Sequence, residues 1–493
     1  MRARRTLAAL VAAGATAAGL GGCAGGDPVA SAGPPDGSTL RATWTDPDGD
    51  GTPQRTPGEP LRDRTDLAAA ARAGRVLGSL GVLTDVHVRD EESPGRVPFL
   101  DRLGAPFSST FRPQDPLSVQ VLVAGVRAVD AARPDAALVL GDLVDNAQRN
   151  ELAWARTALR GGAVRPDSGA PGYQGLQEAS NPDPAFYRPD VDPPRLPGLL
   201  ARAQRPVRSP GLRMPLRVLP GNHDLLLAGE VRRTERTNAV ATADRLLVAP
   251  DAGLLRAGRR EDLLRDGLVD RVLQDGLPGR TRRVAPDPAR RELSPGEATA
   301  ELRGLAGMDR SAARMDRAFD VGRGVRVLAL DTVSRTFGAG GVVTREQVAW
   351  LARELRRAGD RWILVASHHP LRKVRGGDAV LALLDRAPRV LATLNGDTHR
   401  HSITARATPA GGFWQIGTSS LADWPQQGRM LRVRATARGG AVLETWTLDT
   451  APDDLADDAR TLAHLDAQGG RPAGDRGGAR DRNVRLFKPA PRS

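Results

Sequence analysis

Short apolar runs alternate with amphipathic stretches from about residue 76 onward. Asp115 and Pro116 form a good N-cap and first-turn pair for a helix over the first of these amphipathic stretches. Thr344 and Gln347 form a capping box ahead of another. The apolar runs predict strands at 79–84, 136–140, 216–219, 325–330, 362–366 and 390–394. Such an alternation of strands and helices is typical of an α/β domain.

Three further strands are predicted later in the chain, at 412–418, 429–436 and 441–448. The last two are joined through Arg438-Gly439-Gly440 as a hairpin, and we expect all three to complete a second sheet. Two stretches, 147–214 and 225–324, exceed ordinary loop length and predict insertions that flank a site.

These patterns divide the chain into four parts. The Gly- and Pro-rich stretch 24–75 predicts a flexible linker. The alternating strands and helices predict one large domain over 76–450. Residues 451–493 predict a C-terminal helix followed by a tail. Residues 1–23 predict a signal peptide, since Arg2, Arg4 and Arg5 precede an apolar run of about 15 residues.

The signal peptide ends at Leu20-Gly21-Gly22-Cys23, which resembles a bacterial lipobox. Cys23 is the single cysteine, so no disulfide forms within the chain and lipidation is the favoured role for its thiol. Arg4-Arg5-Thr6-Leu7 also resembles a twin-arginine (Tat) signal, which leaves Sec and Tat export both open. Either route predicts an exported lipoprotein on the outer face of the cytoplasmic membrane; without lipidation the chain would be released.

The net charge of +13 comes almost entirely from arginine, since lysine occurs only at Lys373 and Lys488. Acidic and basic residues are mixed along most of the chain, and no aromatic residues are interleaved with a basic block. This mixing favours a solvated surface over a polyanion-binding face and indicates no nucleic-acid partner.

Six of the seven histidines fall in four short blocks, and a fifth block supplies two aspartates. Each block begins where a predicted strand stops, which is where α/β folds gather reactive side chains. The blocks are Leu83–His87, Gly141–Asn146, Gly221–Asp224, Ser367–Pro370 and Gly396–His401.

The residue types in these blocks suit divalent cations. Asp85 and His87 are two residues apart, so both can point to one ion. The carboxylate of Asp142 has two oxygens and can bridge two cations. Asn222 offers a neutral oxygen, and His223 can face a substrate as a proton donor, with Asp224 able to fix its tautomer or raise its basicity.

The order of the five blocks resembles the calcineurin-like metallophosphoesterase superfamily over residues 78–450. The resemblance implies a four-layer αββα sandwich with two mixed β-sheets and a two-metal centre at the carboxyl ends of strands. It assigns Asp85, His87 and His399 to the first metal, Asp142 to the bridge, and Asn222 with His368 to the second metal.

More narrowly, the export signal, the long insertions and the segments Gly417–Ser420 and Asp481–Val484 are similar to a group of secreted bacterial metallophosphoesterases.

One position departs from the superfamily pattern, because Asp397 stands where a histidine is usual. A carboxylate at the second metal favours Mn, Fe or Mg over Zn. Alternatively the second site is weakened and the centre holds one metal loosely, or His401 lends a replacement imidazole. The expected cofactors are two divalent ions of the set Mn, Fe, Mg and Zn.

The resemblance implies an exported hydrolase of phosphate mono- or diesters that uses a metal-bridging hydroxide as nucleophile. His223 would protonate the leaving group, and His369 and Arg400 would contact the substrate. Nucleotide phosphatase, diesterase and nuclease activities stay open. The alternative is a degenerate phosphoesterase lipoprotein that binds anionic polymers without catalysis.

Overall fold

The computed structural model of this chain describes residues 37–103, 108–251, 277, 279–335, 338–470 and 474–491. The predicted signal peptide and Cys23 lie outside the described residues, so export and lipidation stay predictions. In the described part of the chain, no helix combines the length and apolar character needed to cross a membrane.

The first of two mixed sheets has seven strands, in the order β3-β19-β18-β17-β4-β5-β8. Strands β4, β5 and β8 are parallel, whereas β17 is antiparallel to β4 and to β18. The bounds are β3 Arg62–Arg64, β4 Val76–Leu83, β5 Ala136–Leu140, β8 Leu216–Leu219, β17 Gln427–Ala435, β18 Ala441–Asp449 and β19 Val484–Lys488.

The second sheet has six strands, in the order β11-β12-β13-β14-β16-β15. Its four central strands are parallel, and each edge strand is antiparallel to its neighbour. The bounds are β11 Arg317–Val321, β12 Val325–Leu330, β13 Trp362–Ser367, β14 Val390–Asn395, β15 Ser402–Arg406 and β16 Phe413–Gly417.

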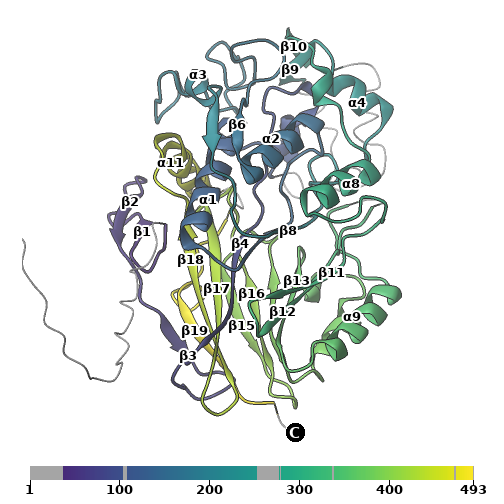
Figure 1. The fold of residues 1–493 in the computed structure, drawn as a ribbon. Coiled ribbons are helices and arrows are strands. Elements are labelled where there is room, and N and C mark those ends of the chain that lie inside the picture. The colour runs from purple at the N-terminus through teal and green to yellow at the C-terminus, as the bar shows by residue number, and fades with distance from the viewer. Residues whose placement is uncertain are drawn as a thin grey trace, which may run out of the picture. The chain divides into compact units, whose positions relative to one another are not determined.

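Helices cover the outer face of each sheet, which confirms the expected α/β, four-layer αββα sandwich (Figure 1). Helices α1 (Ser118–Ala132) and α11 (Asp454–Gln468) pack on the seven-stranded side, and α9 (Arg345–Arg357) and α10 (Gly377–Leu384) on the six-stranded side. Side chains of β13 alternate between the layers, as strand pleating requires. Val365 packs with Leu351 of α9, whereas Leu364 joins the larger apolar cluster that includes Val82 of β4.

The predicted strands at 136–140, 216–219 and 325–330 coincide with β5, β8 and β12. The expectation that 412–418, 429–436 and 441–448 complete one second sheet is wrong. β16 pairs with β14 in the six-stranded sheet, while the β17–β18 hairpin pairs with β4 in the other. A hairpin connection fixes which strands neighbour each other but not which sheet they join.

Helix α1 begins later than its predicted N-cap. Asp115 lies in a 3-10 turn, Asp115–Leu117, and α1 starts at Ser118. The Asp115 carboxylate does not cap the helix because it accepts hydrogen bonds from Arg89, Arg96 and the backbone of Arg112. The predicted capping box of Thr344 and Gln347 is present at the start of α9.

Both predicted insertions carry secondary structure of their own. The stretch 147–214 contains α2 (Arg149–Arg160), β6 (Gly162–Val164), α3 (Leu199–Ala203) and β7 (Val207–Ser209). The stretch 225–324 contains α4 (Glu235–Ala241), β9 (Arg245–Pro250), β10 (Gly279–Arg283) and α8 (Pro295–Leu305). It also includes β11, which belongs to the six-stranded sheet, so this insertion ends before residue 317.

The predicted flexible linker 24–75 is corrected for its described part, from residue 37. Strands β1 (Ala42–Thr45) and β2 (Gln54–Pro57) form a hairpin, and β3 pairs with β19. The Thr39 hydroxyl bonds to Asn483 at 2.9 Å, and Asp46 pairs with His464 of α11 at 3.0 Å. These contacts are polar, so the hydrophobic pattern does not reveal them. The C-terminal tail likewise contributes a strand, β19.

Glu297 gives a pH-dependent contribution to stability at the start of α8. The backbone N–H and hydroxyl of Ser294 donate to its carboxylate at 2.8 Å each, Arg291 pairs with it at 2.9 Å, and together these lower the pKa of Glu297 to about 2. Since the folded-state pKa lies below the unfolded one, the stabilisation is complete above about pH 4.5 and is lost as pH falls toward 2.

We therefore expect Glu297→Gln to lower the unfolding free energy at pH 7 by less than about 1 kcal/mol, because the side chain is 45% exposed and solvent screens it. Urea unfolding of both proteins at pH 7 and pH 3 measures this. The difference should shrink at pH 3; a difference that grows there contradicts the assignment.

Candidate metal centre

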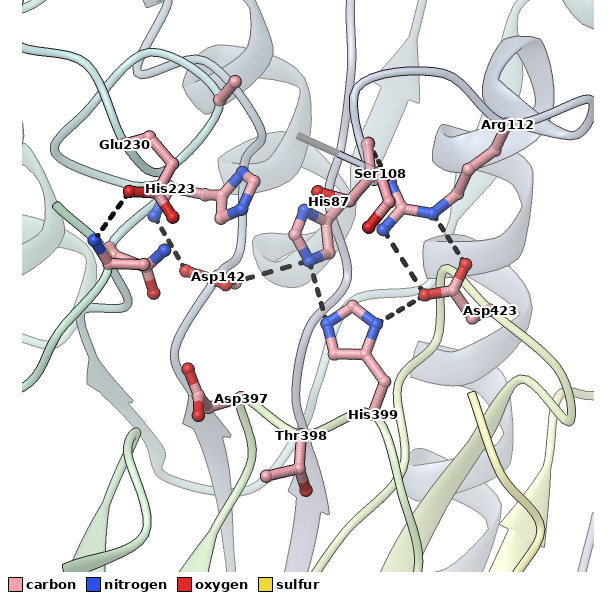
Figure 2. A pocket seen from close by; sticks show the side chains of 14 residues that line it. His87, Ser108, Arg112, Asp142, His223, Glu230, Asp397, Thr398, His399 and Asp423 are labelled. Atoms are coloured by element: carbon pink, nitrogen blue, oxygen red, sulfur yellow. Dashed lines mark hydrogen bonds and ion pairs between the residues drawn. The ribbon is translucent and has the colours of Figure 1, made fainter. Parts of the chain in front are cut away.

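Five strand ends meet at one edge of the two sheets and bring the seven predicted ligands together. β4, β5 and β8 come from one sheet, and β13 and β14 from the other. Their carboxylate and imidazole atoms form groups in which all ligand atoms lie within 4.8 Å of one another. One group consists of Asp85, His87 and His399, and another of Asp85, Asp142 and His368. A third consists of His368, His369 and Asp397, and a fourth of His87, Asp142 and His223. Figure 2 shows several of these side chains pointing into one pocket.

The backbone at these strand ends is held in an unusual conformation. Five of the seven predicted ligands have a positive φ, between 49° and 66°: Asp85, His87, Asp142, Asp397 and His399. This left-handed region is uncommon for residues other than glycine and costs on the order of 1 kcal/mol per residue. Such a concentration of strain in one site indicates that the surrounding fold imposes these side-chain directions.

Two glycines allow predicted ligand carboxylates to approach the backbone closely. A Cβ at Gly221 would lie 2.0 Å from Oδ1 of Asp142, and one at Gly396 would lie 2.5 Å from Oδ2 of Asp85. Both distances are far shorter than a real contact permits. The glycines of these blocks are therefore needed because ligand carboxylates from other strands pack directly against their backbone.

In the first group, Nε2 of His87 and Nε2 of His399 lie 3.3 Å apart, and Asp85 Oδ1 lies 3.3 Å from Nε2 of His399. Nδ1 of His87 donates to Asp145 at 2.8 Å, and Nδ1 of His399 donates to Asp423. A carboxylate can only accept, so both imidazoles carry a proton on Nδ1. Their Nε2 atoms consequently face one another and Asp85.

In the second group, Nδ1 of His368 donates to the carbonyl of Leu140 at 2.9 Å, which leaves Nε2 toward the centre. That Nε2 lies 3.3 Å from Asp142 Oδ2 and 3.2 Å from Asn222 Oδ1. The Asn222 amide nitrogen donates away from the centre, to the carbonyl of Gly229. Its oxygen is therefore the atom presented to an ion.

These donors fit divalent cations. In both groups, lone pairs of Nε2 atoms face carboxylate or amide oxygens, an arrangement that needs positive charge between them. The pKa of His399 also indicates that positive charge is favoured here. Burial alone would lower this pKa, but Asp85 and Asp423 outweigh burial and raise it to about 10. Either protons or cations must supply this charge, and the mixed nitrogen and oxygen donors suit Zn, Mn or Fe.

His223 lies beside the two groups and lines the same pocket (Figure 2). Its ring is 4.4 Å from that of His87, and its Nδ1 donates to the carbonyl of Asp145 at 3.0 Å. Burial opposes its charge, but Asp142 and Asp145 outweigh burial and raise the pKa of His223. Nδ1 is thus fixed as a donor, and Nε2 can act in the pocket.

The role predicted for Asp224 is wrong. Its two carboxylate oxygens accept the backbone N–H groups of Val144 and Gly221, at 3.0 and 2.8 Å. Asp224 therefore fixes the two loops that carry Asp142 and His223. Asp145, the last aspartate of the Gly141–Asn146 block, orients the His223 ring instead.

Neither of the two residues predicted to contact the substrate, His369 and Arg400, lines the pocket. The Arg400 side chain is 61% exposed and pairs with Asp475 at 3.0 Å. His369 is buried beside the second group, with Nδ1 bonded to Thr332 and Nε2 to the carbonyl of Ala339, at 2.8 Å each. Burial lowers the pKa of His369 to about 3, so this ring is neutral.

His401 does not replace the missing imidazole, because its buried ring bonds to Gln427 and Arg429.

Several pocket residues were not predicted. The cavity, of about 190 Å³, is also lined by Ser108, Arg112, Glu230 and Asp423. Asp423 lies six residues beyond the end of β16 at Gly417, so it does not stand at a strand end as the predicted ligands Asp85, Asp142 and His368 do. Arg112 and Glu230 belong to no motif and follow no predicted strand.

Asp397 lies at the rim of the second group, with a side chain 23% exposed. We expect Asp397→His to raise the ratio of bound Zn to bound Mn by about tenfold, because an imidazole replaces a hard oxygen donor. Competitive dialysis against both metals, followed by elemental analysis, measures the ratio. An unchanged ratio would show that Asp397 is not a ligand.

Comparisons with known proteins give limited further information. The chain matches no protein-family model and no curated protein sequence. Among solved structures it is similar to a dimetal phosphatase from Danio rerio, at 13% identity and a TM-score of 0.37, covering 76% of this chain and 100% of that one. It is also similar to the sulfate thiohydrolase SoxB of Thermus thermophilus, at 13% identity and a TM-score of 0.29, covering 81% and 62%.

With TM-scores this low, neither likeness adds to what the side chains indicate. The paired mixed sheets and the converging ligand groups are what the resemblance to the calcineurin-like metallophosphoesterase superfamily implies. The predicted fold and the predicted convergence of the ligand side chains are therefore confirmed, and membership of the superfamily and of its secreted bacterial subgroup stays a prediction.

Proposed function

We propose that this chain is an exported, binuclear metallophosphoesterase that hydrolyses phosphate mono- or diesters outside the cytoplasm. The observation that carries the proposal is the position of Asp142. Its carboxylate lies 3.3 Å from Nε2 of His368 and 3.7 Å from Nε2 of His87, so it connects the two ligand groups. Next to it, His223 is held in the tautomer that leaves Nε2 toward the pocket.

Different residues would bind the cations and donate the proton during ester hydrolysis. Two divalent cations would supply positive charge to the phosphate oxygens and lower the pKa of the attacking water. Asp85, His87 and His399 would hold one cation, Asn222, His368 and Asp397 the other, and Asp142 both. His223 would donate a proton to the departing oxygen, and Asp145 keeps its ring in place.

The pocket favours a small, polar leaving alcohol. A cavity of about 190 Å³ is below the roughly 300–1,000 Å³ typical of drug-sized ligands. Apart from histidine, the described lining residues include no aromatic ring on which a nucleobase could stack. Glu230, held by the N–H of Ala339 at 3.1 Å, adds a carboxyl group to the wall. A leaving group that carries hydroxyl or ammonium donors suits this wall better than a nucleoside.

Hydrolysis by metal-stripped and metal-reloaded protein tests the proposal. Protein reloaded with Mn should cleave p-nitrophenyl phosphate or bis(p-nitrophenyl) phosphate, and stripped protein should cleave neither. Comparison of kcat/KM for glycerol phosphate and adenosine monophosphate tests the substrate class, with the glycerol ester expected to be better. If fully loaded protein cleaves no ester yet binds anionic polymers, the alternative of a non-catalytic binding lipoprotein replaces the enzyme.

Export and membrane anchoring form a separate part of the proposal. They rest on the sequence of residues 1–23, with Cys23 as the lipidated residue. Mass spectrometry of the mature N-terminus should find a diacylglyceryl-modified Cys23. An unmodified N-terminus beyond residue 23 would indicate a released protein.

A further inference from the structure

The imidazole of His399 is supported by a buried ion pair. Asp423 accepts from Nδ1 of His399, and both of its oxygens also bond to Arg112, with Nε of Arg112 2.6 Å from Oδ1. Asp423 is 3% exposed and Arg112 is 2% exposed. The Arg112 guanidinium, which stays charged in proteins, donates to both oxygens of Asp423 and so pairs it as a carboxylate.

The other imidazole of the first group has the same kind of support. Asp145 Oδ1 accepts from Nδ1 of His87 at 2.8 Å, and Oδ2 pairs with Arg89 at 2.6 Å. Arg89 is 3% exposed, so this ion pair is buried like that of Asp423 and Arg112. His368 of the second group differs, because only the neutral carbonyl of Leu140 accepts from its Nδ1.

Asp115 connects the Arg112–Asp423 pair to the Arg89–Asp145 pair. Its Oδ2 accepts from Arg89 at 2.5 Å, from the backbone N–H of Arg112 at 2.9 Å and from Arg96 at 2.6 Å. Asp115 is 5% exposed, does not line the pocket and contacts no predicted ligand. One continuous set of hydrogen bonds thus runs from His399 through Asp423, Arg112, Asp115, Arg89 and Asp145 to His87.

We infer that Asp115, Arg112 and Asp423 are positioning residues that set the affinity of the first group for its cation by holding His87 and His399 in one orientation and tautomer. The inference rests on the proposed metal centre but not on the reaction. An ionised carboxylate on Nδ1 fixes the proton there, directs the Nε2 lone pair to the ion and makes it a stronger donor. Each arginine prevents its aspartate from turning away.

The test is cation binding to metal-stripped protein, measured by isothermal titration with Mn²⁺ and by the visible absorption of bound Co²⁺. Asp423→Asn removes the negative charge that accepts the hydrogen bond from Nδ1 of His399. Arg112→Met removes the guanidinium that holds Asp423 in place. Asp115→Asn weakens the connection between Arg112 and Arg89. We expect each variant to weaken one of the two binding events 10- to 100-fold. The other event, assigned to the His368 group, should be unchanged, and Arg112→Lys should restore part of the loss.

A matched control separates positioning from general destabilisation. Asp331 is fully buried and pairs with Arg335, but it touches no predicted ligand. Asp331→Asn should lower the thermal unfolding midpoint of metal-free protein by a similar amount to Asp115→Asn while both cation affinities stay at the wild-type value.

Two results would overturn the inference: wild-type affinities in all three positioning variants, or an equal loss in the Asp331 control. Failure of the proposed function looks different. In that case wild-type protein would bind two cations, the variants would weaken one of them, and no ester would be cleaved.

Discussion

Asp142→Asn is expected to lower kcat for phosphoester hydrolysis by roughly 10³-fold or more and to reduce the bound metal below two ions per chain. Asparagine keeps the shape of the side chain, and its oxygen can still accept the backbone N–H of His223, which lies 2.9 Å from Asp142 Oδ1. What is lost is the negative charge shared by the two ligand groups. Steady-state kinetics together with elemental analysis of the same sample measure both effects.

Arg400→Ala is the control for this prediction. Arg400 lies close to the ligands in sequence, but its side chain is exposed and paired with Asp475, away from the pocket. Its removal should leave kcat and metal content within about twofold of the wild type, as is usual for surface substitutions. Retention of full activity and both ions by Asp142→Asn would remove the basis of the proposed metal centre.

The second large effect is expected for His223→Ala, which should lower kcat by about 10²- to 10⁴-fold for esters of alkyl alcohols. The metal content should stay at two ions, since His223 is not among the proposed ligands. The loss should be much smaller for p-nitrophenyl phosphate, because p-nitrophenolate leaves without needing a proton. A loss of kcat that depends on the leaving group distinguishes a missing proton donor from a defect in metal binding.

The outcome that contradicts a proton-donor role is an equal loss for alkyl and p-nitrophenyl esters. His223 would then stabilise the phosphoryl group in the transition state, through Nε2, whatever the leaving group.

The convergence of the predicted ligands could be anticipated from the sequence because several of them follow a local rule. Asp85, Asp142 and His368 each follow a buried strand within two residues, and the carboxyl ends of parallel strands meet at one edge. Closeness to a strand end in sequence does not predict the position of the Arg400 side chain, although Arg400 lies one residue beyond His399. There the chain turns into the edge strand β15, and Arg400 pairs with Asp475 outside the pocket.

The supporting residues could not be predicted because their partners are distant in sequence. Arg112 and Asp423 are separated by 311 positions, and neither belongs to a recognisable motif. Asp115 has an equally plausible local role as an N-cap, and only the fold shows that its carboxylate faces Arg89 and Arg96. Polar contacts of this kind have no periodicity, so hydrophobic patterning carries no information about them.

The order of strands in the seven-stranded sheet has a consequence for biogenesis. β19, at residues Val484–Lys488, lies between β18 and β3, and β3 comes from residues Arg62–Arg64. The ribosome therefore releases the partner of β3 only after more than four hundred further residues have been made. Until then one margin of the sheet exposes unpaired backbone, which is a template for aggregation.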